Sequence, residues 1–308
     1  MSASSSRDRT SRASAMSQAH ITDRASSTSA PGSSSDRLLR TIQITFGGMT
    51  TMVDMHGKIV GITGLASGIG AETAKLLMRR GASIVGFDRN EPDYQIAAFH
   101  RIDMADPASI EASLAALGQR LDGLCNVAGV PPTADKATVL KVNFFGLRHF
   151  TELAADHLVD GAPIVNVASL AGFAWRSNME VVKAGMATDF AGADAWIAEQ
   201  PVEGAPSYHL SKELVVAWTL WNCQRWKARG IRMNSVSPGP VSTPILADFV
   251  KTLGKRVEED LKVNRAATPE EIAPVIAFLC SADARWMNGS DVAVDAGAGA
   301  GAWQQLLG

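Results

Sequence analysis

The run Lys58-Ile-Val-Gly-Ile-Thr63, followed at once by Gly64-Leu-Ala-Ser-Gly-Ile-Gly70, decides the fold of this chain. The first part is a short continuous apolar run, which indicates a buried strand. After the second part, apolar residues recur at helical spacing as far as Gly81. Glycines in a strand-to-helix turn let the backbone approach a pyrophosphate, and the helix N-terminus offers it unpaired N–H groups. This order predicts a dinucleotide-binding turn; the alternative is an ordinary strand-helix connection.

The same alternation of apolar runs and amphipathic stretches continues along the chain. Further strands are expected at residues 83–87, 99–102, 124–127, 163–168, 231–236 and 291–294, and helices at 107–117, 139–158, 208–229 and from 268 onward. Strands that alternate with helices predict right-handed crossovers and an α/β fold, a doubly wound parallel sheet of the Rossmann type. We expect a single domain over residues 56–308.

Residues 1–55 differ in composition from the rest of the chain. Ser and Arg are frequent in the first part, and large apolar side chains are nearly absent there. Such a segment buries too little surface to offset the entropy of ordering, so we expect a disordered tail that activity does not need. One alternative is an organelle-targeting peptide, which Asp8, Asp23 and Asp36 argue against. Another is a start codon assigned too far upstream.

The composition of the 308 residues narrows the class of protein. Hydrophobic residues make up 46%, enough for a sizeable core, and the formal net charge is -2. Nucleic acid is not expected as a partner, because phosphate contacts need a basic surface. No apolar run approaches the roughly 18 residues that a membrane span needs. Cys125, Cys223 and Cys280 are far apart, which argues against disulfides and metal sites and favours a cytoplasmic protein.

A second pattern is formed by Tyr208 and Lys212 in the segment Tyr208-His-Leu-Ser-Lys212. Four residues apart on a helix, the two side chains share one face. A tyrosine ordinarily titrates near about pH 10, and an ammonium group one turn away, together with an oxidised nicotinamide, is expected to lower that pKa toward neutrality. Tyr208 would then exchange a proton with an alcohol or a carbonyl while hydride passes between that substrate and the cofactor.

The residue that ends the second strand bears on the choice of cofactor. Asp88 lies about 20 residues beyond the glycines, where an acid accepts hydrogen bonds from ribose hydroxyls and repels a 2′-phosphate. This favours NAD over NADP. Arg89 argues for NADP, because a guanidinium is able to hold a 2′-phosphate. The alternative for Asp88 is a plain surface residue of a turn.

These patterns occur in order with Asn126-Val-Ala-Gly129, Asn143, Ser169 and Pro238-Gly-Pro-Val-Ser-Thr243. Across most of the chain, the set resembles the short-chain dehydrogenase/reductase family. The resemblance implies an oxidoreductase that uses a nicotinamide cofactor. It also implies that Ser169 hydrogen-bonds the substrate oxygen, that Lys212 binds the nicotinamide ribose, and that Asn143 holds a water of a proton relay.

The glycine loop and the resemblance together define an expected site. The catalytic residues are Asn143, Ser169, Tyr208 and Lys212. The cofactor-binding residues are Gly64, Ser67, Gly68, Ile69, Gly70, Asp88, Asp103, Met104, Asn126, Ala128, Gly129, Tyr208, Lys212, Pro238, Gly239, Val241 and Thr243. Asp103 is expected against the adenine, and Asn126 as a brace of its strand. Taken singly, Asn143, Ser169 and Asp103 are better explained as a helix-surface amide, a strand-end cap and a turn residue. We assign no chemistry to Cys125 or His209.

One departure from the family pattern lies between Ser169 and Tyr208. Here 38 residues separate the two, far more than in most members. The extra segment, about residues 173–205, is rich in apolar side chains with helical spacing in parts. It is expected either to wall the substrate site as a lid or to pack against a neighbouring subunit. The chain is expected to form a homo-oligomer, dimer or tetramer, although the insertion puts in doubt the helix pairing by which many members form tetramers.

The insertion and several short motifs bear on the substrate. A long insertion at this place is similar to that of members that act on 3α-hydroxysteroids and carbonyls. Motifs such as Arg285-Trp-Met-Asn-Gly289 are more similar to members that oxidise aromatic allylic alcohols. We expect NAD-dependent oxidation of a coniferyl-type alcohol, a small molecule with an apolar body, to its aldehyde, with the steroid substrate as alternative. A regulator that senses NAD without chemistry is a further alternative, which the complete catalytic set disfavours.

Overall fold

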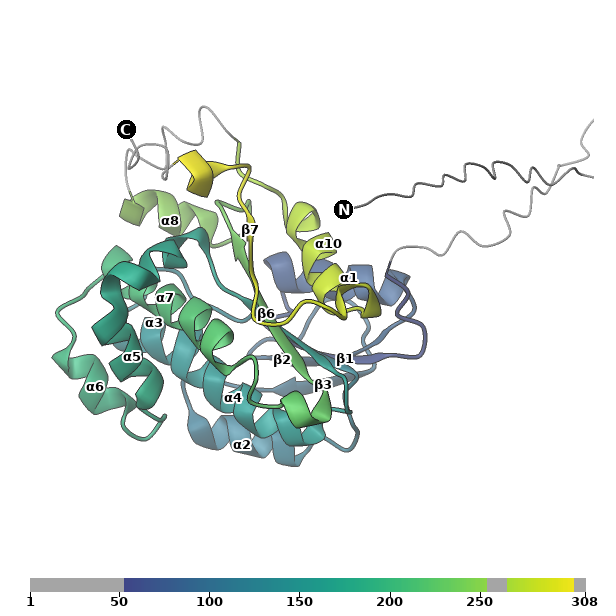
Figure 1. Ribbon diagram of the computed structural model, residues 1–308. Coiled ribbons are helices and arrows are strands. Elements are labelled where there is room, and N and C mark those ends of the chain that lie inside the picture. Colours follow the sequence, from purple (N-terminus) through teal and green to yellow (C-terminus); the bar gives the residue numbers. More distant parts are fainter. Residues whose placement is uncertain (1–52, 254–264, 302–308) are drawn as a thin grey trace, which may run out of the picture. The chain divides into compact units, whose positions relative to one another are not determined.

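The computed structural model describes residues 53–253 and 265–301, and Figure 1 shows a sheet with helices on both faces. The strands in the described residues are β1 (Ile59–Thr63), β2 (Ser83–Asp88), β3 (Ala98–Arg101), β4 (Gly123–Asn126), β5 (Pro163–Val167), β6 (Arg232–Pro238) and β7 (Asp291–Val294). They pair in parallel in the order β3-β2-β1-β4-β5-β6-β7. The expected doubly wound, Rossmann-type sheet is confirmed, with each strand within two residues of its expected position.

The helices of the described residues form the two outer layers. The longer ones are α1 (Gly68–Arg79), α2 (Pro107–Ala115), α3 (Lys136–Leu140), α4 (Leu147–Ala154), α5 (Met179–Ala187), α6 (Ala193–Glu199), α7 (Ala205–Asn222), α8 (Leu246–Leu253) and α10 (Pro269–Leu279). The 3₁₀ and π segments are η1 (Lys141–Gly146), η2 (Ala155–His157), η3 (Leu170–Asn178), η4 (Lys227–Arg229) and η5 (Ala282–Ala284). The helices α1 and α10 pack together over one face of the sheet, and α2, α4 and α7 cover the other (Figure 1).

The chain changes direction across the sheet between β1 and β4. It runs outward from β1 through β2 to β3, and then returns to place β4 on the other side of β1. Thr63 and Asn126, the last residues of β1 and β4, pair in register at this point. Because the connections leave these two strands in opposite directions, a crevice opens at their carboxyl ends, where open α/β sheets bind ligands.

Two of the expected long helices differ from the structure. The helix expected at 139–158 begins at Lys136 and is interrupted by the π segment η1, which starts at Lys141. At the end of η1, a side chain at Gly146 would come within 2.0 Å of the Met104 carbonyl oxygen, so the wide turn packs closely on the loop after β3. The helix expected at 208–229 instead begins at Ala205, with a proline in its first turn, and ends at Asn222.

The folded part begins slightly earlier than expected. We placed its start at about His56, yet Val53 and Met55 are buried against the face covered by α1 and α10. The Val53 backbone N–H also donates a hydrogen bond to Asp283 Oδ2 at 2.8 Å. The tail expected to be disordered is residues 1–55, and residues 1–52 of it lie outside the described residues.

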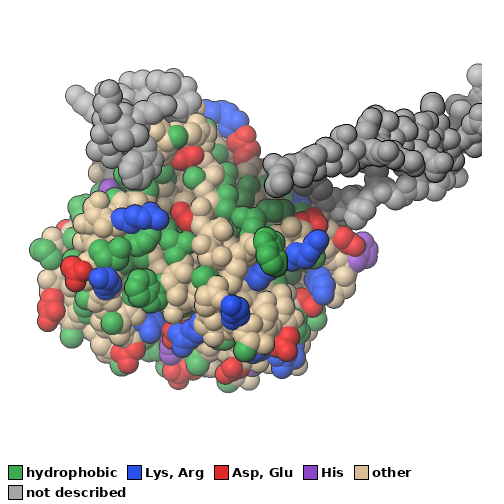
Figure 2. Space-filling model, in the orientation of Figure 1, with side chains coloured by type: hydrophobic (Ala, Val, Ile, Leu, Met, Phe, Trp, Pro, Cys, Tyr) green, Lys and Arg blue, Asp and Glu red, His purple; other side chains and the backbone are tan. Residues whose placement is uncertain are grey.

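The surface is mixed in charge. On the face seen in Figure 2, lysines and arginines alternate with acidic side chains over the described part of the chain. Among the described residues, no helix is both long and apolar enough to cross a membrane.

Candidate active site

The glycine loop after β1 is shaped by contacts that leave no room for side chains. Gly64 has a φ of +71°, and a Cβ atom there would lie 2.5 Å from Ala128 Cα. A Cβ atom at Gly70 would lie 2.1 Å from the Gly64 carbonyl oxygen. The loop therefore packs closely on the residues that follow β4 and leads directly into α1. The N–H groups at the N-terminus of α1 are suited to bind an anion.

One large cavity, about 1290 Å³, adjoins this loop. Residues at or just beyond the end of every strand of the sheet line it, among them Gly64, Asp88, Asp103, Ala128, Ser169, Gly239 and Asp295. All the residues expected in the site line this cavity except Asn126 and Asn143. The structure therefore brings the glycine loop and the Tyr208–Lys212 pair into a single cavity, although about 140 residues of sequence lie between them.

Asp88, at the end of β2, is held toward the glycine loop. Its Oδ2 atom accepts a hydrogen bond from the Ala66 backbone N–H at 3.0 Å, and Oδ1 accepts one from the Asn90 N–H at 3.0 Å. The carboxylate is thus fixed beside the loop by two backbone donors. The neighbouring Arg89 also lines the cavity but is exposed.

Ser169, Tyr208 and Lys212 come together in this cavity. Ser169 follows β5 and caps η3, because its Oγ atom accepts a hydrogen bond from the Ala171 N–H at 3.2 Å. Tyr208 and Lys212 lie one turn apart near the start of α7, and both are buried. The Lys212 ammonium donates to the Val167 carbonyl oxygen at 3.0 Å and lies 5.7 Å from the centre of the Tyr208 ring.

Burial sets the protonation of this pair in the protein alone. It raises the pKa of Tyr208 to about 12, and a hydrogen bond with Ser169 offsets only part of that rise. Burial also lowers the pKa of Lys212 to about 8. The lysine one turn away therefore does not by itself make the phenol acidic. An oxidised nicotinamide, the second positive charge invoked from the sequence, would lower the Tyr208 pKa when the cofactor is bound.

Asn143 lies in the π segment, behind the cavity wall. Its Oδ1 atom accepts a hydrogen bond from the Val130 N–H at 2.8 Å, and its Nδ2 atom donates to the Ser211 hydroxyl at 3.2 Å. The side chain is fully buried, so it is not the helix-surface amide considered from the sequence. It joins the segment after β4 to α7 next to Lys212.

Two family models match this chain: one described as short chain dehydrogenase over residues 58–185, and one described as Enoyl-(Acyl carrier protein) reductase over residues 193–299. The chain is 40% identical over 249 residues to a coniferyl-alcohol dehydrogenase of Pseudomonas sp. strain HR199, a match that spans 80% of this chain and 98% of that protein. The chain belongs to the short-chain dehydrogenase/reductase family. It is an oxidoreductase that uses a nicotinamide cofactor.

Other members of the family are more distant. A 3-alpha-hydroxysteroid dehydrogenase/carbonyl reductase of Comamonas testosteroni is 30% identical, over 78% of this chain and 95% of that protein. The crystal structure of a 3-alpha-hydroxysteroid dehydrogenase from Pseudomonas sp. B-0831, complexed with NADH, superposes with a TM-score of 0.66 at 32% identity, over 77% of this chain and 95% of that chain.

The residues of this dehydrogenase fit a nicotinamide dinucleotide. The glycine loop is a cradle that any side chain at Gly64 or Gly70 would fill. The Asp88 carboxylate, the Tyr208 hydroxyl and the Lys212 ammonium line the same cavity. Hydrogen-bond acceptors suited to a ribose and donors suited to a pyrophosphate are thus arranged along one groove.

Asn126, at the end of β4, forms hydrogen bonds inside the protein and does not line the cavity. Its Nδ2 atom donates to Thr151 Oγ1 and to Asn166 Oδ1, both at 2.8 Å. All three side chains are buried between the sheet and the helices α4 and α7. This network fixes the end of β4, from which Ala128 and Gly129 reach the cavity.

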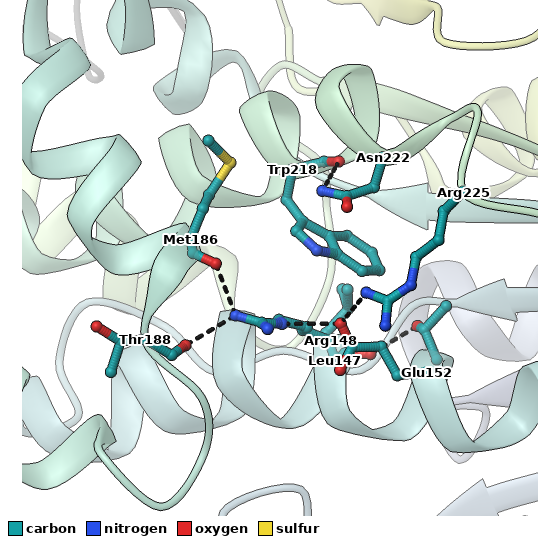
Figure 3. A network of polar contacts seen from close by, with 9 residues as sticks. Leu147, Arg148, Glu152, Met186, Thr188, Trp218, Asn222 and Arg225 are labelled. Carbon is teal, nitrogen blue, oxygen red and sulfur yellow. Dashed lines mark hydrogen bonds and ion pairs between the residues drawn. The ribbon is translucent and has the colours of Figure 1, made fainter.

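The insertion forms η3, α5 and α6, and only its first part reaches the cavity. Phe173 and Ala174, in η3, line the cavity wall. Figure 3 shows how the far end of α5 is attached to α4: Arg148 donates to the Met186 and Thr188 carbonyl oxygens at 2.8 and 2.7 Å. The insertion thus contributes a wall of the cavity and is anchored to the helices of its own chain.

Some cavity residues were not among those expected from the sequence. Glu213 and Asp295 line the cavity, as does His209, to which we assigned no chemistry. Asp295 follows β7, so the rule that ligands bind at the carboxyl ends of parallel strands identifies it. The sequence indicates Glu213 more weakly, only through its position next to Lys212 on a helix that is buried.

Proposed function

We propose that this enzyme oxidises an aromatic allylic alcohol of the coniferyl type to its aldehyde with NAD. The observation that carries the proposal is the convergence of Ser169, Tyr208 and Lys212 on one cavity with the glycine loop. The relative with 40% identity, a coniferyl-alcohol dehydrogenase, supports this substrate class. The apolar wall around Phe173 suits an aromatic ring.

In the proposed reaction, the residues of this chain handle the proton. The Ser169 hydroxyl donates a hydrogen bond to the substrate oxygen and holds it beside the phenolic oxygen of Tyr208. Tyr208, as the phenolate, accepts the hydroxyl proton of the alcohol, and the C–O bond gains its double-bond character as hydride leaves the carbon. A nicotinamide cofactor, when bound, would supply the hydride acceptor and a positive charge that favours the phenolate. Lys212 orients the cofactor ribose, and Asn143 keeps the backbone beside it in place.

A panel of alcohols tests the proposal. With NAD present, formation of NADH is expected with coniferyl alcohol and not with a 3α-hydroxysteroid. Tyr208→Phe is expected to lower kcat/KM by about a hundred- to ten-thousandfold, because only the proton acceptor is lost, while NAD binding is retained. Preference for the steroid would instead favour the activity named for the relatives with 30% and 32% identity. NAD binding without turnover of any alcohol or carbonyl would refute the enzyme assignment.

The choice of NAD rests on Asp88. A carboxylate fixed beside the glycine loop by two backbone N–H groups disfavours a 2′-phosphate by charge repulsion. Asp88→Ala is expected to lower the ratio of kcat/KM for NAD to that for NADP by about tenfold or more, which is about 1.4 kcal/mol or more of lost discrimination. Arg89→Ala removes the neighbouring guanidinium, which favours NADP, so this comparison variant should not lower the ratio. An unchanged ratio in the Asp88 variant would contradict the assignment.

We also propose that the enzyme is a cytoplasmic homo-oligomer. The free thiols of Cys125, Cys223 and Cys280 suit a reducing compartment. Phe190 and Trp196 of the insertion pack against Phe145 of the chain itself. Since the insertion occupies this helical surface, the proposal favours a dimer over a tetramer built by helix pairing. Light scattering on the purified protein distinguishes the two.

A further inference from the structure

The cavity contains one buried carboxylate that the proposed reaction does not use. Glu213 follows Lys212 on α7 and lines the same cavity as Tyr208. Its side chain is only 7% exposed, and no ion pair to it exists among the described residues. Burying a carboxylate without a compensating charge is costly, so donors must stabilise it.

The insertion supplies one donor to this carboxylate. Asn178, at the end of η3, donates from Nδ2 to Glu213 Oε2 at 2.8 Å. No hydrogen bond to the other oxygen, Oε1, is found among the described residues. Burial raises the pKa of Glu213, whereas the hydrogen bond from Asn178 lowers it. The group is therefore incompletely solvated, and a further donor from the cavity would stabilise its charged form.

The surroundings of Glu213 are otherwise a tightly packed wall. A side chain at Gly172 would come within 2.6 Å of the Lys212 carbonyl oxygen, so η3 lies directly on α7 at this point. Phe173 and Ala174 of η3 line the cavity beside it, and His209 lies one helical turn before Glu213. Glu213 thus places a fixed acceptor in the cavity wall, next to Phe173 and Ala174 of η3.

We propose that Glu213, oriented by Asn178, accepts a hydrogen bond from a phenolic hydroxyl at the far end of the substrate. Glu213 is then a specificity-determining residue, and the preferred substrates are ring-hydroxylated aromatic alcohols. The inference rests on the proposed oxidation of aromatic allylic alcohols. Tyr208 and Glu213 are five positions apart, an advance of about 7.5 Å along α7, so the two groups are separate enough for a molecule with its reacting alcohol at one end and a phenol at the other. Asn178 acts as a positioning residue.

The first experiment uses the native protein and three alcohols that share one reacting group. Coniferyl alcohol carries the ring hydroxyl, its phenolic methyl ether lacks the donor, and cinnamyl alcohol lacks the ring substituents altogether. We expect kcat/KM for coniferyl alcohol to exceed both others by about ten- to a hundredfold, the usual value of a hydrogen bond to a charged group. Equal kcat/KM for the three would overturn the inference.

The second experiment uses variants. Glu213→Gln is expected to lower kcat/KM for coniferyl alcohol by about tenfold and to leave that for cinnamyl alcohol within about twofold. Asn178→Ala should act in the same direction, on the hydroxylated alcohol alone. Glu180→Gln, an exposed acid of α5, is the control and should change neither.

Turnover of cinnamyl alcohol also reports that each variant is folded. An equal loss on all three alcohols in Glu213→Gln would overturn the specificity role and leave the proposed oxidation intact. If the native protein oxidises none of the three, the proposed function fails, and this inference fails with it.

Discussion

At the residue scale, burial rather than spacing decides the chemistry of the Tyr208–Lys212 pair. Their separation on α7 is a local property of the sequence, but the pKa values are not. Enclosure between the sheet and η3 raises the pKa of the phenol and lowers that of the amine. The amine is directed to the Val167 carbonyl oxygen, a contact 45 residues away along the chain. The protein therefore holds, in the wall of its cavity, a buried lysine whose charged form burial disfavours.

That cost predicts a trade-off between stability and activity. Burial lowers the pKa of Lys212 from 10.5 to about 8, so between these two pH values the unfolded chain binds more protons than the folded protein. The free energy of unfolding therefore rises with pH across this window, and the full cost of burying the charge is present below pH 8. Lys212→Met is expected to raise the free energy of unfolding at pH 7 by up to about 3 kcal/mol while activity is lost. Urea unfolding measures this. The gain should shrink toward pH 10.5, and Lys183→Met, at an exposed site, should show none.

The glycine loop gives a second prediction at this scale. Gly70→Ala places a Cβ atom against the Gly64 carbonyl oxygen, so the loop must shift. We expect NAD affinity to fall by about tenfold or more, because the backbone donors of the loop lose their alignment. Calorimetric titration measures the affinity. Gly118→Ala, where the new Cβ meets nothing within 4 Å, is the control. An unchanged affinity in Gly70→Ala would contradict this role of the loop.

At the scale of elements, the helix expected at 139–158 contains a feature that the spacing of apolar residues does not predict. Its apolar spacing predicts a continuous helix, yet η1 widens it around Asn143. The wide turn is required by contacts outside the helix, the close approach of Gly146 to the loop after β3 and the hydrogen bonds of Asn143 with Val130. Such π segments are frequent at functional sites. No local pattern in the sequence predicts one here.

The insertion provides the prediction at this scale. Arg148→Ala removes both hydrogen bonds to the end of α5, so we expect a loss of about 1–3 kcal/mol in unfolding free energy and faster proteolysis between residues 179 and 199. KM for the alcohol should rise, since η3 continues directly into α5. Arg225→Ala, which removes a second contact to Glu152 without touching the insertion, is the matched control (Figure 3). Identical effects of the two variants would show that the anchoring does not matter.

At the scale of the whole molecule, the described part forms a continuous three-layer structure whose cavity gathers residues from every strand end. The start of this unit is set by packing. Val53 and Met55 are buried on the face that carries α1 and α10, although the composition around them gave no sign of it.

Two shortened chains test that boundary. A chain that begins at Met52 should keep full activity, because residues before it are expected to be dispensable. A chain that begins at His56 loses the burial of Val53 and Met55 and should be less stable by about 2–5 kcal/mol. Thermal unfolding measures the difference. A large loss of activity on removal of residues 1–51 alone would refute the expectation that this segment is dispensable.

The sequence by itself determined the order and position of the strands, the glycine loop and the pairing of Tyr208 with Lys212. These features depend on periodicity, on the conformational freedom of glycine and on spacing within one helix, all of which are local along the chain. Only the tertiary structure decided the π turn at Asn143, the direction of the Lys212 amine, the anchoring of the insertion by Arg148 and the contact of Asn178 with Glu213. Each of these joins residues distant in sequence, and burial among such partners sets their hydrogen bonds and their pKa values.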